Sequence, residues 1–151
     1  MKRFRFPLRP VAILRAHKEM IAREAFALSV QAYVKAEEQL ATARSRLRSL
    51  ESELTTGRTR QFDAAAEARA LAAYRDECDV EAEADKAMRS AQDLMQQRRL
   101  QYLEAHRRVE VVKRLEEKAR QAHRHETNRE EQAEFDDFAT RRFSRRSLHS
   151  A

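Results

Sequence analysis

The amino-acid sequence predicts an all-α protein, folded as a long antiparallel two-helix coiled-coil hairpin in which the second helix is longer than the first. Helix breakers are scarce, because the 151 residues include one glycine and two prolines. Charged residues make up 37% of the chain and aromatic residues 7%, a composition that argues against a thick hydrophobic core. Apolar residues instead recur at intervals of three and four, which is the pattern of a narrow coiled-coil seam.

The first helix is predicted from residue 9 to about residue 54. Proline fits before a helix or in its first turn but not in its interior, so Pro7 and Pro10 place the helix start between Leu8 and Val11. The predicted seam consists of Phe26, Tyr33, Leu40, Leu47 and Leu54, interleaved with Ser29, Ala36, Ala43 and Leu50. A further seven-residue series, Leu14, Ile21 and Leu28, follows a shifted stripe, as expected where the register slips or a second surface is covered.

The turn is predicted at residues 55–62, around the only glycine. Gly57 favours the end of a helix, and the threonines beside it compete for backbone hydrogen bonds. Asp63 is the expected cap of the second helix, predicted over about residues 63–143 and followed by a basic tail. The seam of this helix is predicted at Met88, Ala91, Met95, Arg98, Tyr102, Ala105, Val109, Val112, Glu116 and Ala119. All of residues 1–151 are expected to form a single coiled-coil rod.

A turn at this position sets which residues face each other across the hairpin. Antiparallel partners are expected to have residue numbers that add to about 117, which places Phe26 near Ala91 and Leu8 near Val109. The second helix then continues alone beyond Val109, and we expect this last part to become ordered against a partner. A parallel dimer through the same seams stays open as an alternative, since heptads do not identify the helix that they face.

The sequence carries no recognisable catalytic or metal-binding motif. A two-helix rod offers no cleft for catalysis, and His123 and His125 point to different helix faces. The single cysteine, Cys78, cannot form an intramolecular disulfide. We therefore predict a non-enzymatic protein with no cofactor, no metal and no small-molecule substrate. No apolar run approaches the ~20 residues that span a bilayer, and no signal peptide is recognisable, so a cytoplasmic location is expected.

Aromatic and basic residues gather near the end of the chain. Phe135 and Phe138 share one helix face beyond the part that the first helix can cover. Two explanations stay open: they pack against Phe4 and Phe6, or they dock into a groove of a partner. The tail also contains Arg141, Arg142, Arg145 and Arg146, with Phe143 between them. Such a tail binds phosphate backbones, but acids are interleaved with the bases from Arg120 to Arg142, which makes nucleic acid the weaker candidate.

The chain resembles a known family, and two segments carry most of the resemblance. The basic and aromatic start, Phe4 to Leu14, and the acidic-aromatic-basic close, Glu130 to Arg142, are similar to the flagellar export protein FliJ family, related to the injectisome YscO family. The resemblance spans the whole chain. It implies an antiparallel two-helix coiled coil, similar to the central stalk of rotary ATPases, that serves the flagellar type III export apparatus.

The resemblance also implies partners and a binding end. The partners would be the hexameric export ATPase, which the stalk stimulates, the membrane export gate protein, and export chaperones; the location would be the cytoplasmic face of the inner membrane. The ATPase-facing residues would be Lys2, Arg3, Arg5, Phe135, Asp136, Asp137, Phe138, Arg141 and Arg142. The gate-facing region of the second helix matches the family poorly, because Leu71, Tyr74 and Cys78 lie among alanines and acids. A general coiled-coil scaffold and a non-specific nucleic-acid-binding hairpin are the alternatives.

Overall fold

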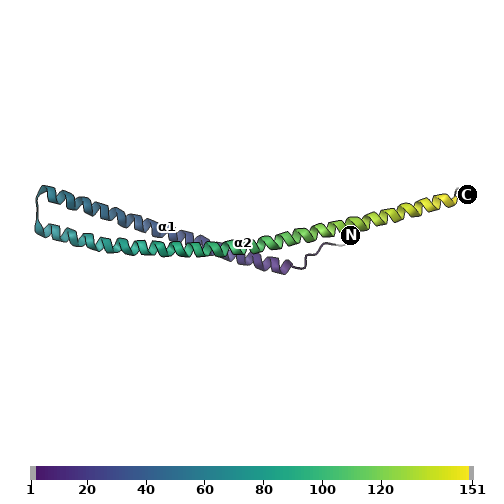
Figure 1. Cartoon of the computed structure of the whole chain (residues 1–151), viewed down its shortest axis with the longest axis horizontal. Coiled ribbons are helices and arrows are strands. Elements are labelled where there is room, and N and C mark those ends of the chain that lie inside the picture. The colour runs from purple at the N-terminus through teal and green to yellow at the C-terminus, as the bar shows by residue number, and fades with distance from the viewer. Residues whose placement is uncertain (1–2, 150–151) are drawn as a thin grey trace. The chain divides into compact units, whose positions relative to one another are not determined.

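A computed structural model describes residues 3–149, with side chains described up to residue 145. Two helices make up almost all of this part of the chain: α1, Arg9–Arg60, and α2, Ala64–His149 (Figure 1). The residues before α1 are not helical. The two helices pack against each other, no strand occurs among the described residues, and α2 is the longer helix. The predicted all-α fold with a longer second helix is therefore confirmed.

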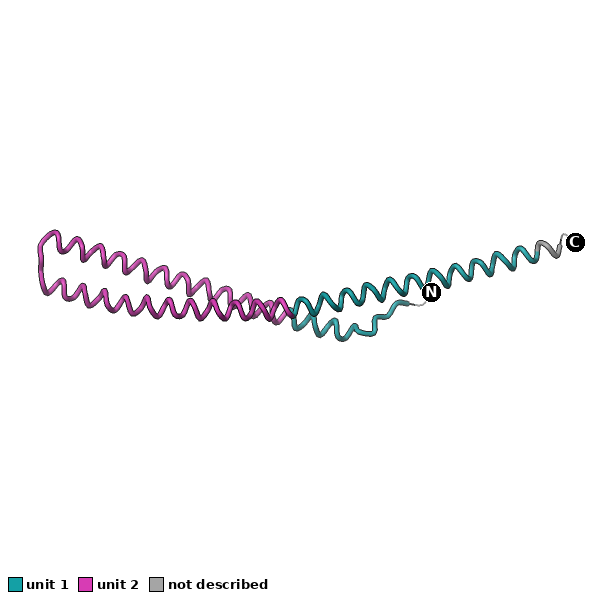
Figure 2. The backbone as a smooth tube through the Cα atoms, in the orientation of Figure 1, with its two compact units in different colours: residues 1–19, 105–151 teal, residues 20–104 magenta. Residues whose placement is uncertain are grey.

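The chain divides into two compact units (Figure 2). Unit 1 combines Met1–Glu19 with Ala105–Ala151, and unit 2 is the continuous stretch Met20–Glu104. Each unit contains a piece of both helices. Unit 2 is the closed end of the helical hairpin, and unit 1 contains the chain start and the far part of α2.

The predicted seam of α1 is the buried face of unit 2. Leu40 and Ala43 are each 3% exposed, and the other predicted seam positions of α1 are buried or half-buried. Ser29 is buried as well, and its hydroxyl is satisfied there by donating a hydrogen bond to the carbonyl oxygen of Phe26 at 2.6 Å. The α2 seam matches its prediction except at Arg98, which is exposed. The heptad pattern thus identified the packed faces.

The position of the turn was predicted wrongly, because α1 continues through the threonine cluster to Arg60. Thr55 and Thr56 hydroxyls donate to the carbonyl oxygens four residues earlier, at 2.8 and 2.9 Å, so they bond within the helix. Gly57 has a negative φ and needs no special conformation. The connection is only residues 61–63. Asp63 caps α2 as predicted, since its carboxylate accepts the Ala65 N–H at 3.1 Å.

The longer α1 changes the register of the hairpin. Tyr74 Oη donates to the Glu51 carboxylate at 3.0 Å, and the rings of Phe26 and Tyr102 stack with centroids 6.1 Å apart. Facing residues therefore have numbers that add to about 125 rather than 117, and the predicted pairing of Phe26 with Ala91 is wrong. The hydrogen bond to Glu51 also raises the pKa of Tyr74 to about 12, because the carboxylate opposes loss of the phenolic proton.

Ion pairs bridge the two helices of unit 2 beside the seam. Arg44 pairs with Glu81 at 3.0 Å and with Asp85 at 3.5 Å, and Arg58 pairs with Glu67 at 2.7 Å. The arginine side chains are more than half exposed, so each pair stabilises the fold by less than about 1 kcal/mol. Their main effect is on register, because they match only when the helices are correctly aligned.

The series Leu14, Ile21 and Leu28 does not join a packed seam within the described part of the protein. All three side chains are more than half exposed. Neither helix, over its described residues, contains a stretch apolar enough to cross a membrane.

Cross-linking tests the register of unit 2. In a Cys78→Ser background, cysteines at Phe26 and Tyr102 should form an intrachain cross-link with high yield, because the two side chains face each other. Cysteines at Phe26 and Ala91 should not, because Ala91 lies 11 residues, or about 16 Å, away along α2 from Tyr102. The measurement is the mobility of the oxidised chain on a denaturing gel. Efficient linking of the second pair, or links formed only between chains, would contradict this register.

Candidate functional site

The chain start is fastened to α2 by aromatic contacts in unit 1. The Phe4 ring meets the His123 ring edge-on with centroids 5.5 Å apart, and the Arg120 guanidinium lies 5.4 Å from the centre of the same ring. Phe6 is buried. These contacts bury apolar surface and add a cation–π attraction, so residues 3–8 extend the cover of α2 beyond the start of α1.

The packed centre of unit 1 lies about two to four turns earlier along α2. Val109 and Val112 are buried there, and the Glu19 carboxylate lies 2.7 Å from His106 Nδ1. The predicted neighbour of Val109, Leu8, is 41% exposed, and Val109 instead shares a groove with residues 12 and 16. Close by, a hydrogen bond from Lys113 at 3.1 Å lowers the pKa of the Glu110 carboxyl.

An open groove of about 1010 Å³ lies between the chain start and α2. We call it the basic groove; its lining residues are Arg3, Phe4, Arg5, Phe6, Pro7, Arg9, Pro10, Ile13, Glu116 and Arg120. Arg120 donates to the single acid of the lining, Glu116, at 2.9 Å. The other three arginines are exposed and form no ion pair within the described part of the chain. The groove thus combines apolar walls with free guanidinium groups.

Beyond His123, α2 continues with exposed aromatic side chains. We call residues 124–145 the terminal segment. Phe135, Phe138 and Phe143 are 70%, 65% and 76% exposed. Packing of Phe135 and Phe138 on Phe4, one of the two explanations left open, is wrong: Phe4 contacts His123, which is 12 residues, or about 18 Å, from Phe135 along the helix.

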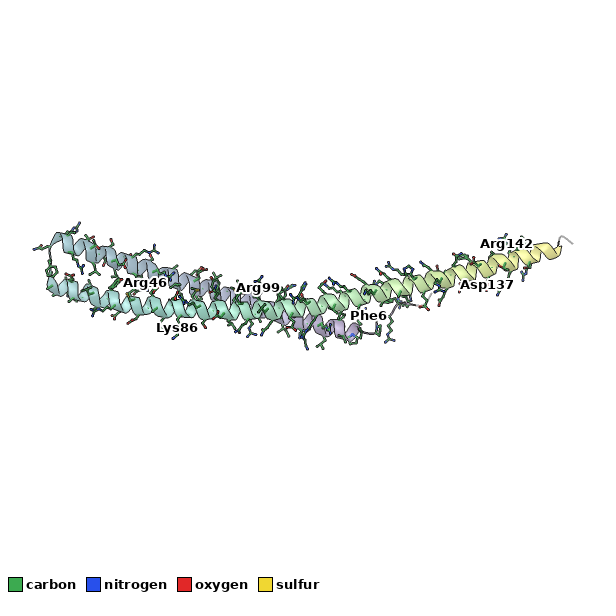
Figure 3. The ribbon with its side chains drawn as sticks, viewed as in Figure 1. Phe6, Arg46, Lys86, Arg99, Asp137 and Arg142 are labelled. Carbon is green, nitrogen blue, oxygen red and sulfur yellow. The ribbon has the colours of Figure 1, made fainter. Side chains whose placement is uncertain are left out.

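The predicted charged site residues of the terminal segment, Asp136, Asp137, Arg141 and Arg142, are also exposed. Asp136 accepts a hydrogen bond from Gln132 at 3.2 Å, and its carbonyl oxygen accepts the Thr140 hydroxyl at 2.8 Å. Arg141 and Arg142 are exposed and form no ion pair among the residues whose side chains are described. Asp137 and Arg142 appear on the unaccompanied part of α2 in Figure 3. These guanidinium groups are free to bind a carboxylate or phosphate in two-pronged fashion.

The predicted site residues fall into two groups in unit 1. Arg3 and Arg5 line the basic groove, whereas Phe135 to Arg142 lie on the terminal segment. Lys2 lies outside the described residues. Sequence reasoning missed Arg9, Arg120 and His123 as companions of the chain start. The correct register would have found the last two, since their numbers and those of Phe4 add to about 125.

No group of three or more histidine, cysteine, aspartate or glutamate residues in the described part of the protein is placed to hold a metal ion. Aromatic anchors and free arginines are instead the residue types that dominate protein interfaces. The arrangement in unit 1 is therefore suited to binding another macromolecule.

Comparison with known proteins identifies the family. No curated protein and no solved structure matches the chain. The family model described as flagellar FliJ protein matches residues 4–148, which is nearly the whole chain and agrees with the resemblance of its two ends. The chain therefore belongs to the flagellar FliJ family and is a component of the flagellar export apparatus.

Proposed function

We propose that this protein is a cytoplasmic stalk that binds and stimulates the hexameric flagellar export ATPase. The observation that carries the proposal is the terminal segment, where Phe135 and Phe138 are 70% and 65% exposed beside free arginines. Exposed aromatic pairs on one helix face are costly in water unless a partner covers them. Membership of the FliJ family supports an ATPase as that partner.

The proposed mechanism is differential binding. The terminal segment inserts into the ATPase ring, where Phe135 and Phe138 fill apolar pockets and Arg141 and Arg142 bind carboxylates. The stalk shifts the ring toward the conformations that it binds more tightly, and faster hydrolysis follows if those conformations are on the catalytic path. The segment is one continuous helix, so it presents these side chains in a fixed order.

The proposal extends to the membrane side of the apparatus. Unit 2 would couple the ATPase to the export gate protein and meet export chaperones, at the cytoplasmic face of the inner membrane. Leu71 and Cys78 are half-buried in the hairpin and Tyr74 is bonded to Glu51, so contacts there would use the flanking exposed residues of α2. This protein would contribute binding energy and no catalytic group of its own.

Binding to nucleic acid is the second candidate, favoured by the net charge of +6 and by the free arginines of unit 1. Such binding would ignore sequence and would weaken steeply with salt, with a log–log slope of about −0.9 per phosphate contact on duplex DNA. The terminal segment also carries a block of acids between its arginines, and these acids repel a phosphate backbone. A protein surface with its own pattern of both charges fits this segment better.

A binding comparison separates these candidates and a plain scaffold. The purified chain should bind the cognate export ATPase at physiological salt and raise its rate of hydrolysis, while a random DNA duplex should bind far more weakly. Titration calorimetry or fluorescence anisotropy measures both affinities. Submicromolar binding to random duplex DNA together with no association with the ATPase would falsify the stalk proposal. A failure to bind either partner would leave the scaffold alternative.

A further inference from the structure

We propose that two copies of this protein associate through unit 1, with the acidic segment of each copy in the basic groove of the other. The acidic segment is defined as residues 130–138. It contains five carboxylates, no basic residue, and Phe135 and Phe138. The basic groove presents the opposite charge and apolar walls. The same chain thus carries both halves of a complementary interface.

The acidic segment matches the groove in charge and in residue type. On an α-helix, Glu130, Glu134 and Asp137 align along one edge, with Phe138 and Phe135 beside them. Glu134 and Asp137 are exposed and form no ion pair among the described side chains. An acidic edge beside two aromatic rings is the counterpart of guanidinium groups placed beside Phe4, Phe6 and two prolines.

The segment cannot reach the groove of its own chain. Residues 105–149 belong to one uninterrupted helix, and Glu134 lies 14 residues, or about 21 Å, beyond Arg120 along it. The groove is built on α2 at Glu116 and Arg120. A straight helix cannot fold back on itself, so the occupant has to come from another molecule.

Two-fold symmetry satisfies both contacts at once. If the α2 helices of two copies lie antiparallel about an axis near residue 126, the stretch around Lys118 in one copy lies beside Glu134 in the other, and the converse holds. Such an interface uses the same surface twice, as closed homodimers do. Both grooves and both acidic segments are then covered in one assembly.

This association covers Phe135 and Phe138, the aromatic residues proposed above to engage the ATPase. A copy in the dimer therefore cannot bind the ATPase at the same time. Only this consequence rests on the proposed function. The dimer itself is tested with the chain alone, so its failure is distinguishable from a failure of the ATPase proposal.

Charge reversal tests the dimer. One variant reverses the groove, Arg5→Glu with Arg9→Glu, and a second reverses the segment, Glu134→Arg with Asp137→Arg. Each alone should weaken self-association by about tenfold or more, because like charges then meet at both contacts. An equal mixture should recover heterodimers, since each altered surface then meets a complementary one. Sedimentation equilibrium at low and high salt measures the association, which should weaken as salt screens the charges.

The matched control reverses two exposed basic residues of unit 2, Lys86→Glu with Arg99→Glu, which are labelled in Figure 3 and are not among the residues that line the groove. It should self-associate like the wild type. Circular dichroism establishes that every variant is folded. A wild-type chain that stays monomeric at low salt and high concentration overturns the proposal. So does a mixture that stays monomeric, or a control that weakens association as much as the groove variant.

Discussion

Leu40→Asp is expected to cause the largest loss of stability in this protein. Leu40 is 3% exposed in the seam of unit 2, so the substitution removes buried apolar surface and places a carboxylate among apolar side chains. Loss of the leucine side chain alone costs about 2–5 kcal/mol, and burial of the carboxylate adds to it. We expect a loss of about 4 kcal/mol or more in the free energy of unfolding, measured by urea denaturation followed by circular dichroism.

The neighbouring substitution Gln39→Asp is the matched control, because it introduces the same side chain at an exposed position of the same helix turn. Its effect should stay within about 0.5 kcal/mol. Leu40→Met, which conserves volume, should cost less than about 1.5 kcal/mol. Equal urea midpoints for Leu40→Asp and Gln39→Asp would show that this seam is not a packed core.

Changes in the terminal segment should have the largest effect on function while leaving the fold intact. Phe135→Ala with Phe138→Ala removes two exposed aromatics, and Arg141→Glu with Arg142→Glu reverses two free charges. Each double variant should raise the concentration needed for half-maximal ATPase stimulation by about tenfold or more, because aromatic and arginine anchors carry most interface energy. Hydrolysis by the cognate ATPase at two ionic strengths is the measurement.

Salt distinguishes the two variants. Charge reversal should be more harmful at low salt, where repulsion from an acidic ring surface is least screened, whereas loss of the aromatics should depend little on salt. Phe62→Ala is the control for the aromatic pair, because Phe62 is 68% exposed and lies in unit 2, in the connection between the two helices. Full stimulation by both folded double variants would exclude the terminal segment as the ATPase-binding surface and direct attention to unit 2.

The faces of the helices could be read from the sequence, but their alignment could not. A heptad repeat specifies which side of each helix is buried, and Leu40 and Ala43 are buried as predicted. Sliding one helix by a heptad places similar residues opposite each other, so the repeat says little about register. The predicted register was derived from the predicted position of the turn. That position was wrong, because Thr55 and Thr56 form hydrogen bonds within the helix instead of ending it.

The candidate site shows the same division. The composition of the terminal segment was plain from the sequence, including its aromatic pair and its arginines. Whether the chain start covers Phe135 and Phe138 depends on how far it reaches along α2. It contacts α2 through Phe4 at His123, well before Phe135. The basic groove also needed the tertiary structure, because it joins residues 3–13 to residues 116 and 120.

By itself, the sequence determined the all-α fold, the buried faces of both helices, the Asp63 cap and the family. These properties depend on local preference and on periodicity, which a single chain displays. Only the tertiary structure decided the length of α1, the register and the exposure of the terminal segment. These depend on free-energy differences between alternative alignments of two long helices, and in such alignments the same residue types can meet in more than one way.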